Sequence, residues 1–171
     1  MIDLREIKVL VVDDNRHMRY IVKTILHALG CTDIRDSSDA AAAFKELRGI
    51  PPDLIIVDWK MEPLDGLDFT RLVRTAKDSP NPYIPIIMLS AHTEHRRVAE
   101  ARDAGVNEFL AKPISVQSLA RRIESIINHP RHFVRTKTYF GPCRRRQEFG
   151  PPKGLEERRQ DELPEARQFS I

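Results

Sequence analysis

The segment PDLIIVDWKMEPLDG, residues 52–66, carries the strongest structural signal in the chain. Its unbroken apolar run Leu54–Val57 has the length of a strand and is typical of one buried on both faces of a sheet. The run ends on a carboxylate, Asp58, and Pro63 and Gly66 then favour a turn. In open parallel α/β sheets, functional groups gather at the carboxyl ends of the strands. Asp58 is therefore a candidate functional residue, although such an Asp alone is also typical of an ordinary strand end.

Strand-like and helical segments alternate along residues 7–128. Apolar runs predict strands at Ile7–Val12, 54–58, 86–89 and 106–110, and a weaker strand is expected at 33–37. Helices are predicted at about 18–29, 38–48, 67–77, 94–104 and 116–128, the second of them alanine-rich and capped by Ser38-Asp39. Short connections between such elements are the signature of a parallel sheet with helices on both faces. The sequence thus predicts an α/β fold with a five-stranded, doubly wound sheet. The helix at 94–104 has a thin apolar face, mainly Val98, Ala101 and Ala104, which indicates a weakly anchored, movable element.

Length and composition limit the class of protein. A chain of 171 residues with 41% hydrophobic residues holds one domain with an appendage, or at most two small domains. No run approaches the roughly 18 consecutive apolar residues of a membrane span, and the charged N-terminus lacks the architecture of a signal peptide. Cys31 and Cys143 lie too far apart to indicate a disulfide or metal framework. We expect a cytoplasmic protein.

The basic charge of the chain belongs to its C-terminal part. Residues 1–128 contain 18 Lys and Arg against 19 Asp and Glu, whereas residues 129–171 contain 10 against 6. Pro130 ends the last helix, and the periodicity then disappears into a sequence rich in Arg, Pro and Gly. We expect a folded domain at 1–128 and a mostly irregular, largely disordered basic tail at 129–171.

Polar residues end four of the predicted strands and should share one edge of the sheet. They are Asp13, Asp14, Asp58, Ser90 and Lys112. Three converging carboxylates repel one another, and a divalent cation with hard oxygen ligands, Mg²⁺ above all, would relieve this. Asp13-Asp14 alone is also typical of a turn or helix cap, but suitable groups at this many strand ends are hard to assign to chance.

This set of residues points to phosphoryl transfer. A carboxylate such as Asp58 can attack phosphorus and form an aspartyl phosphate. A cation would neutralise the phosphoryl oxygens, Lys112 would add a point charge, and the Ser90 hydroxyl would donate a hydrogen bond to a remaining oxygen.

The pattern strongly resembles the receiver domain of two-component response regulators, of the chemotaxis type, over roughly residues 5–128. The matching residues are Asp13-Asp14, Asp58-Trp59-Lys60-Met61, Leu64-Asp65-Gly66, Ser90-Ala91 and Lys112-Pro113. The resemblance implies a flavodoxin-like sheet with strand order 2-1-3-4-5.

The resemblance also implies a role for each carboxylate. Asp58 would accept a phosphoryl group from a histidine kinase or phosphotransfer protein. Asp14, Asp58 and the backbone carbonyl of Lys60 would bind Mg²⁺, and Asp13 would act through water. The protein would then be a phosphoacceptor that assists its own phosphorylation and dephosphorylation, and not an enzyme with a separate substrate.

Switching would begin at two residues near the phosphoryl group. Ser90 would move toward it, and Phe109, in the family's switch position, would rotate inward. The surface of the fourth helix, fifth strand and fifth helix would then bind a downstream protein. The Lys112-Pro113 peptide bond would be cis, an isomer plausible only before proline.

Two positions depart from the family pattern. Glu62 separates Met61 from Pro63, which predicts an altered loop shape without loss of function. Lys60 lies two residues after Asp58, where a cation can hold or shield the phosphoryl group, so we expect a changed phosphoryl lifetime.

The tail leaves several functions open. Residues 131–146 contain six Lys and Arg, no acidic residue, and interleaved aromatic residues. Such a stretch can bind nucleic acid through phosphate contacts and stacking, dock on an acidic partner, fold back onto the receiver, or remain solvated and disordered. The candidate basic residues are Arg131, Arg135, Lys137, Arg144, Arg145 and Arg146.

Three classes of function follow. The first is a stand-alone receiver that binds another protein, with phosphorylation-driven dimerisation left open. The second is a regulator whose basic tail binds nucleic acid. The third is a phosphatase with an aspartyl-phosphate intermediate, but haloacid dehalogenase enzymes place paired aspartates at i and i+2 after the first strand. Here Asp13 and Asp14 are adjacent, which disfavours this class.

Overall fold

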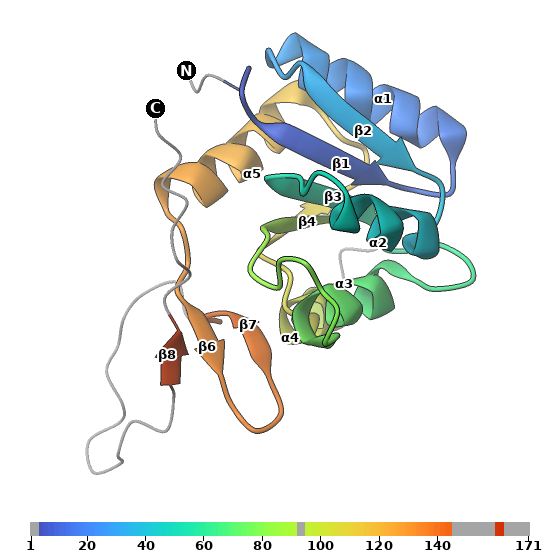
Figure 1. The fold of residues 1–171 in the computed structure, drawn as a ribbon. Coiled ribbons are helices and arrows are strands. Elements are labelled where there is room, and N and C mark those ends of the chain that lie inside the picture. Colours follow the sequence, from blue (N-terminus) through green and yellow to red (C-terminus); the bar gives the residue numbers. More distant parts are fainter. Residues whose placement is uncertain (1–3, 92–94, 145–159, 163–171) are drawn as a thin grey trace.

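A parallel five-stranded sheet forms the centre of the molecule. The computed structural model describes residues 4–91, 95–144 and 160–162, the last of these as backbone. The strands lie in the order β2-β1-β3-β4-β5 (Figure 1) and are β1 Lys8–Val12, β2 Asp33–Ser37, β3 Leu54–Asp58, β4 Ile86–Ser90 and β5 Glu108–Ala111. The predicted fold class and strand order are thus confirmed.

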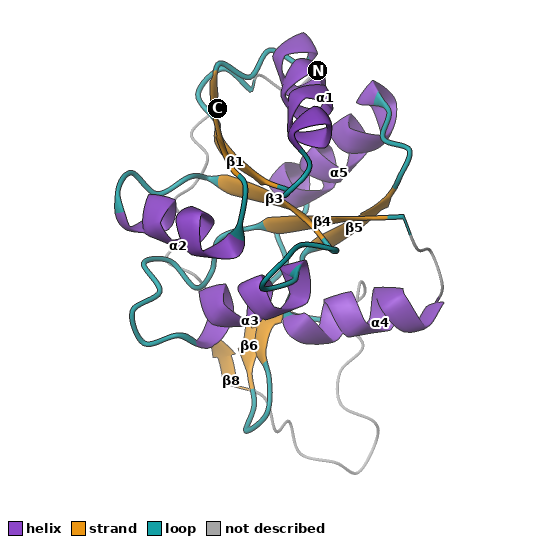
Figure 2. Cartoon of the chain, turned by 90° about the vertical axis from the view of Figure 1, so that its right-hand side faces the viewer, coloured by secondary structure: helices purple, strands orange, loops and turns teal. Residues whose placement is uncertain are grey.

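Helices cover both faces of this sheet. They are α1 Arg16–Ala28, α2 Ala40–Arg48, α3 Gly66–Thr75, α4 His95–Ala104 and α5 Val116–Asn128. Figure 2 shows α1 and α5 on one face and α2, α3 and α4 on the other. Among the described residues, no helix has the length and apolar character needed to cross a membrane.

Capping side chains set where several helices begin. The Asn15 side chain accepts hydrogen bonds from the backbone N–H groups of His17 and Met18, so α1 starts at Arg16, two residues before its predicted start. Asp65 similarly caps α3 at Gly66, one residue earlier than predicted. Apolar periodicity marks the buried face of a helix, whereas its first turn depends on local hydrogen bonds that periodicity does not record.

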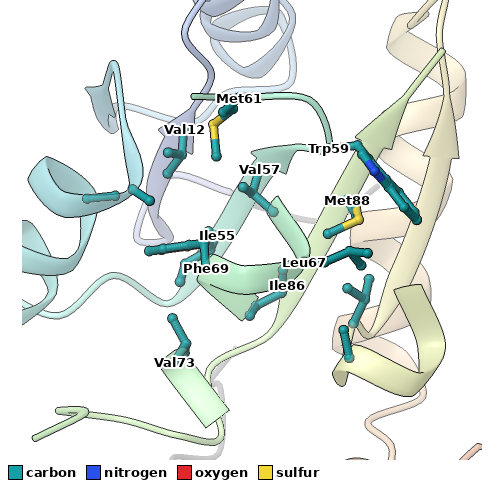
Figure 3. Close-up of a cluster of buried hydrophobic side chains, with 14 of the residues drawn as sticks. Val12, Ile55, Val57, Trp59, Met61, Leu67, Phe69, Val73, Ile86 and Met88 are labelled. Carbon is teal, nitrogen blue, oxygen red and sulfur yellow. The ribbon is translucent and has the colours of Figure 1, made fainter. Parts of the chain in front are cut away.

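The two faces of the sheet form two hydrophobic clusters. All five residues of β3 are buried, as predicted for a strand covered on both sides. Because successive side chains alternate between faces, Ile55 and Val57 pack with the α2–α3–α4 layer, and Leu54 and Ile56 pack with α1 and α5. Figure 3 shows the first cluster.

Helix α4 has little apolar contact with the sheet. Its buried residues are Ala101 and Ala104, whereas Val98 is 39% exposed. Two methyl side chains bury little area, so α4 is anchored even more weakly than the sequence predicts.

The chain after α5 folds into a β-hairpin. Strands β6 Phe133–Arg135 and β7 Phe140–Pro142 pair antiparallel, and the backbone of β8 Gln160–Glu162 pairs with the other edge of β6. Phe133, Val134 and Phe140 are buried. The predicted irregular tail thus contains a short ordered piece at residues 131–144, whose strands gain stability from tertiary packing that leaves no periodic pattern in the sequence.

Gly105 joins α4 to β5 in a left-handed conformation and lies against the hairpin. Its φ is +101°, and a Cβ there would lie 3.0 Å from Arg74 Cγ and 3.3 Å from the backbone oxygen of Phe140. Gly30 is a matched control, because its φ is +90° and a Cβ there would meet nothing within 4 Å.

We expect Gly30→Ala to lower the free energy of unfolding by about 1–2 kcal/mol through backbone conformation alone. Gly105→Ala should cost about 1–3 kcal/mol more, because the new methyl also crowds Arg74 and the hairpin. Urea unfolding of both variants measures the difference. Equal losses would show that the hairpin does not press on Gly105.

Candidate functional site

Three of the predicted site residues meet at the carboxyl edge of the sheet. Lys112 Nζ lies 2.7 Å from Asp58 Oδ1 and 3.5 Å from Asp13 Oδ2. Both carboxylates are buried, with Asp13 at 1% and Asp58 at 5% exposure. Ser90 ends the neighbouring strand β4 and is buried, and its backbone oxygen accepts a hydrogen bond from Lys112 N at 2.8 Å. The sequence therefore identified groups that the fold brings together.

The backbone holds each buried carboxylate in place. Asp13 Oδ1 accepts a hydrogen bond from Asn15 N at 2.8 Å, and Asp58 Oδ2 accepts one from Lys60 N at 2.9 Å. In both cases the N–H group lies two residues further along the chain, and the second oxygen of the carboxylate faces Lys112. Each carboxylate is thus fixed at one oxygen, and its other oxygen lies beside the ammonium group.

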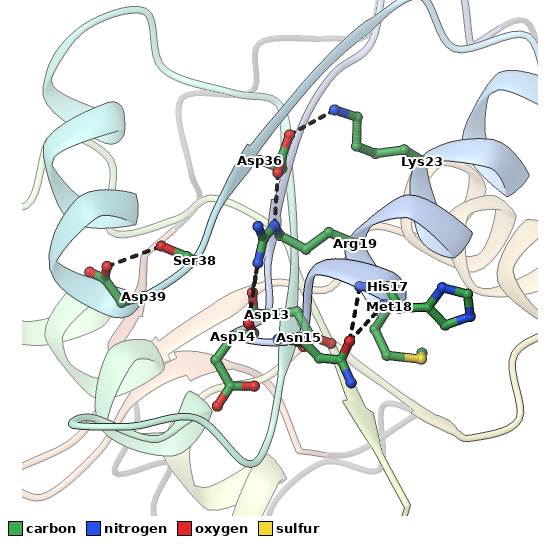
Figure 4. Close-up of polar contacts among 10 residues, drawn as sticks. All are labelled: Asp13, Asp14, Asn15, His17, Met18, Arg19, Lys23, Asp36, Ser38 and Asp39. Atoms are coloured by element: carbon green, nitrogen blue, oxygen red, sulfur yellow. Dashed lines mark hydrogen bonds and ion pairs between the residues drawn. The ribbon is translucent and has the colours of Figure 1, made fainter.

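An ionic network supports the Asp13 loop from behind. Arg19 donates a hydrogen bond to the backbone oxygen of Asp13 at 2.7 Å and pairs with Asp36 at 2.8 Å, as Figure 4 shows. Lys23 pairs with the other oxygen of Asp36 at 2.7 Å. Hydrogen bonds from Lys23, and then from Arg19, hold the pKa of the Asp36 carboxyl below its usual value.

The negative charge of the Asp13 carboxylate is unfavourable in the folded protein. Burial is the main cause that raises the pKa of its carboxyl, and repulsion by Asp58 acts in the same direction. The hydrogen bond from Asn15 N and the charge of Lys112 oppose this rise without cancelling it. Perturbed carboxyls of this kind are typical of functional sites.

The oxygen donors of the site suit a hard divalent cation but do not form a preformed cage. Asp14 is exposed, and its carboxylate turns away from Arg19 and Asp36 (Figure 4). Within the described chain, no three His, Cys, Asp and Glu side chains are arranged to hold a metal ion. An additional positive charge would nevertheless relieve the repulsion between Asp13 and Asp58, so the donor chemistry fits Mg²⁺. Lys60 faces Asp58 with its N–H group.

The loop after Asp58 folds back onto the end of its own strand. Gly66 N donates a hydrogen bond to Trp59 O at 2.8 Å, and a Cβ at Gly66 would collide with the backbone oxygen of Asp58. Only glycine allows this approach. The Lys112-Pro113 peptide bond is cis, as predicted, and the Glu62-Pro63 bond, at the position that departs from the family pattern, is also cis.

An aromatic contact links the site to α4. Trp59 is 7% exposed, and the Phe109 ring meets it edge-on with the centroids 6.4 Å apart. The Arg97 guanidinium of α4 lies over the Trp59 ring, 5.3 Å from its centroid. The sequence flagged Phe109 as the switch residue but not Arg97, since no local signal shows which way an Arg on a polar helix points.

The hairpin uses its basic and aromatic residues within the chain. Arg131 pairs with the buried Glu108 at 3.3 Å, Arg144 pairs with Asp103 at 3.3 Å, and Arg135 lies over the Phe140 ring at 4.2 Å. Lys137 is exposed, and Arg145 and Arg146 lie outside the described residues. Phe133 and Phe140 are buried and do not offer the stacking surface that nucleic-acid binding requires.

The chain is similar to known signalling proteins over its sheet domain. The family profile of the response regulator receiver domain matches residues 9–124. The chain is 35% identical over 119 residues to the chemotaxis protein CheY of Pseudomonas aeruginosa, which covers 70% of this chain and 94% of that protein. It is 36% identical over 121 residues to the chemotaxis protein CheY1 of Helicobacter pylori, which covers 70% and 96%.

Solved structures agree with these relatives. Chemotaxis protein CheY4 of Vibrio cholerae matches with a TM-score of 0.64 and 28% identity, covering 70% of this chain and 98% of that one. The receiver domain of the Francisella response regulator 1452 matches with a TM-score of 0.62 and 29% identity, covering 70% and 94%.

The raised pKa of Asp13 predicts a stability gain on neutralisation. A carboxyl with a raised folded-state pKa favours folding below its unfolded pKa, and this contribution is lost as the pH rises through the folded pKa. Without divalent ions at neutral pH, Asp13→Asn should therefore raise the free energy of unfolding by about 1 kcal/mol. This gain in stability should become smaller at acidic pH, where the Asp13 carboxyl of the wild type is itself neutral.

Urea unfolding as a function of pH measures this effect. Asp14→Asn is the control, because Asp14 is exposed and its replacement should change stability by less than about 0.5 kcal/mol. A loss of stability in Asp13→Asn at neutral pH would contradict the electrostatic account.

Proposed function

Since the chain belongs to the response regulator receiver family, we propose that it is a two-component response regulator that accepts a phosphoryl group on Asp58. The observation that carries this proposal is the contact of Lys112 Nζ with Asp58 Oδ1 at 2.7 Å, beside the buried Asp13. A buried carboxylate held by a backbone N–H on one oxygen and an ammonium group on the other is a positioned nucleophile.

The phosphoryl donor is a phosphohistidine of a kinase or phosphotransfer protein. An Asp58 oxygen attacks phosphorus, the nitrogen–phosphorus bond breaks, and the imidazole leaves with the electron pair of that bond. Lys112, already beside Asp58, pairs with a phosphoryl oxygen as negative charge accumulates there. The Ser90 hydroxyl, at the end of the adjacent strand, donates a hydrogen bond to another phosphoryl oxygen.

Mg²⁺, when bound, supplies the positive charge that neutralises the phosphoryl oxygens and the attacking carboxylate. Asp14 and Asp58 would hold it with the backbone carbonyl of Lys60, and Asp13 would act through water. The raised pKa of Asp13 supports a cation at this edge. The protein assists its own phosphorylation and dephosphorylation and does not turn over a separate substrate.

The output is the binding of a downstream protein in the cytoplasm. Ser90 moves toward the phosphoryl group and Phe109 rotates inward, which changes the surface formed by α4, β5 and α5. The half-buried Phe109 and the weakly anchored α4 support this step, because both can move at low cost. Nucleic-acid binding is not proposed, because Phe133 and Phe140 of the hairpin are buried and Tyr139 packs against Arg144.

The single tryptophan makes the proposal directly measurable. Trp59 follows Asp58 and contacts Phe109 and Arg97. We expect its fluorescence to change on addition of Mg²⁺, and to change again with beryllofluoride or a small phosphodonor. Asp58→Ala should lack the second change, because it has no carboxylate to be modified. A second change of equal size in Asp58→Ala would refute the assignment of the phosphoacceptor.

Lys60 should lengthen the lifetime of the phosphoryl group. Its exposed side chain lies two residues from Asp58, and an attraction of about 1 kcal/mol corresponds to a rate change of about fivefold. We therefore expect Lys60→Asn to lose phosphate about fivefold faster. Lys45→Asn makes the same charge change on the exposed face of α2 and should match the wild type. Indistinguishable dephosphorylation rates for Lys60→Asn and the wild type would exclude this role.

A further inference from the structure

The β6–β7 hairpin docks on the receiver where the parallel strands begin, at the opposite end of the strands from Asp58. Tyr83, which precedes β4, packs against both hairpin aromatics, with ring centroids 5.1 Å from Phe133 and 5.3 Å from Phe140. Phe133 and Phe140 also contact each other at 5.7 Å. Figure 2 shows β6 beyond α3, on the side of the sheet that carries α2, α3 and α4. Three aromatic rings thus form a closed cluster between the receiver and the hairpin.

Arg74 of α3 builds the receiver side of this docking surface. Its buried guanidinium donates hydrogen bonds to the backbone oxygens of Gly105 at 3.0 Å and Ile84 at 2.7 Å, and to Asn107 Oδ1 at 2.9 Å. Phe133 covers it, 5.0 Å from the guanidinium carbon to the ring centroid. Arg74 thereby joins α3, the start of β4 and the end of α4 under one hairpin residue.

The hairpin contacts the residues that end α4. A Cβ on Gly141 would lie 2.9 Å from the Cα of Gly105, so the two glycine backbones are in direct contact. Arg144 pairs with Asp103 of α4 at 3.3 Å and lies over the Tyr139 ring at 4.1 Å. The Tyr139 hydroxyl in turn donates a hydrogen bond to the backbone oxygen of Pro142 at 2.7 Å. Backbone contact and an ion pair thus meet at the same helix end.

A buried ion pair anchors the start of the segment. Glu108 opens β5 and is 5% exposed, and it pairs with Arg122 of α5 at 3.0 Å and with Arg131 at 3.3 Å. A buried carboxylate requires cationic partners, so the contact of Arg131 with Glu108 ties the start of the segment to β5. The segment is therefore fixed both before and after the hairpin.

We propose that residues 131–144 form an intrachain clasp that holds the carboxyl-terminal end of α4 and opposes movement of this helix. Helix α4 buries only Ala101 and Ala104 of its own residues, so the contacts of the clasp with Asp103 and Gly105 add to an otherwise small anchoring. The family profile ends at residue 124, so the clasp lies outside the matched receiver region. Its residues Arg131, Arg135 and Arg144 contact partners within the same chain.

The clasp also links the two edges of the sheet, a consequence that rests on the proposed function. Helix α4 touches Trp59, next to the phosphoacceptor, through Arg97, and touches the clasp through Asp103. A shift of α4 on phosphorylation must strain the clasp, and release of the clasp must ease that shift by the same free energy. The clasp is therefore a built-in restraint on switching.

The test uses the full chain and two variants with the same charge change in the same hairpin. Phe140→Asp places a charge in the aromatic cluster and should release the clasp. Thr138→Asp places it in the exposed turn of the hairpin and should leave the clasp closed. Hydrogen exchange of the α4 amides, measured without ligand, should be about tenfold faster or more in Phe140→Asp and unchanged in Thr138→Asp.

If the amides of Thr136 and Cys143 exchange fast in Phe140→Asp while the α4 amides exchange as in the wild type, the clasp proposal is refuted. Wild-type hairpin amides that exchange as in an unfolded chain would overturn it as well. If the amides of β1 and β3 also lose protection in Phe140→Asp, the variant unfolds the whole domain, and the milder variant Arg144→Gln is used to test the clasp instead. Arg144→Gln removes the pair with Asp103 and the stacking on Tyr139, leaves the Tyr83–Phe133–Phe140 cluster unchanged, and must still accelerate exchange at the end of α4.

The consequence for switching has its own measurement. Titration with beryllofluoride at fixed Mg²⁺, followed by Trp59 fluorescence, should show an affinity about fivefold higher or more in Phe140→Asp than in Thr138→Asp. Equal or weaker binding in Phe140→Asp would refute the restraint on switching. A wild-type fluorescence response identical to that of Asp58→Ala would instead refute the proposed function. The hydrogen-exchange experiment would still test the clasp, because it uses no ligand.

Discussion

One ammonium group between two buried carboxylates is the constraint on which the site depends. Lys112 Nζ lies within 3.5 Å of both Asp13 and Asp58, each almost fully removed from solvent. Charges at this depth interact strongly, and the carboxylates would repel each other without a cation between them. Only parallel strands that end at the same edge bring these three residues together, from positions far apart in the sequence.

At this edge, the charges that the chemistry requires lower the stability of the fold. The pKa of the Asp13 carboxyl remains raised although Lys112 and Asn15 N partly offset its burial. The fold tolerates this because the strands behind the site are among its best-packed parts, with every residue of β3 and β4 buried. A strongly packed sheet thus supports a charged, unfavourable edge whose chemistry requires those charges.

Helix α4 connects this edge to the opposite one. Its own apolar face is small, and its ends contact Trp59 through Arg97 and the hairpin through Asp103 and the following Gly105. An element anchored this weakly has few contacts to break when it moves. Residues 131–144, basic in composition, are in this arrangement part of the receiver's own packing.

The sequence by itself determined the sheet and the residues of the charged edge, and the family resemblance implied the strand order. Buried parallel strands are continuous apolar runs with polar residues directly after them, so both signals are local in the chain. Only the tertiary structure decided that Arg97 covers Trp59, that Asp14 points to solvent, and that the hairpin docks beside Arg74. These contacts join segments remote in sequence, and their free energy comes from burial and charge pairing that exist only once the chain has folded.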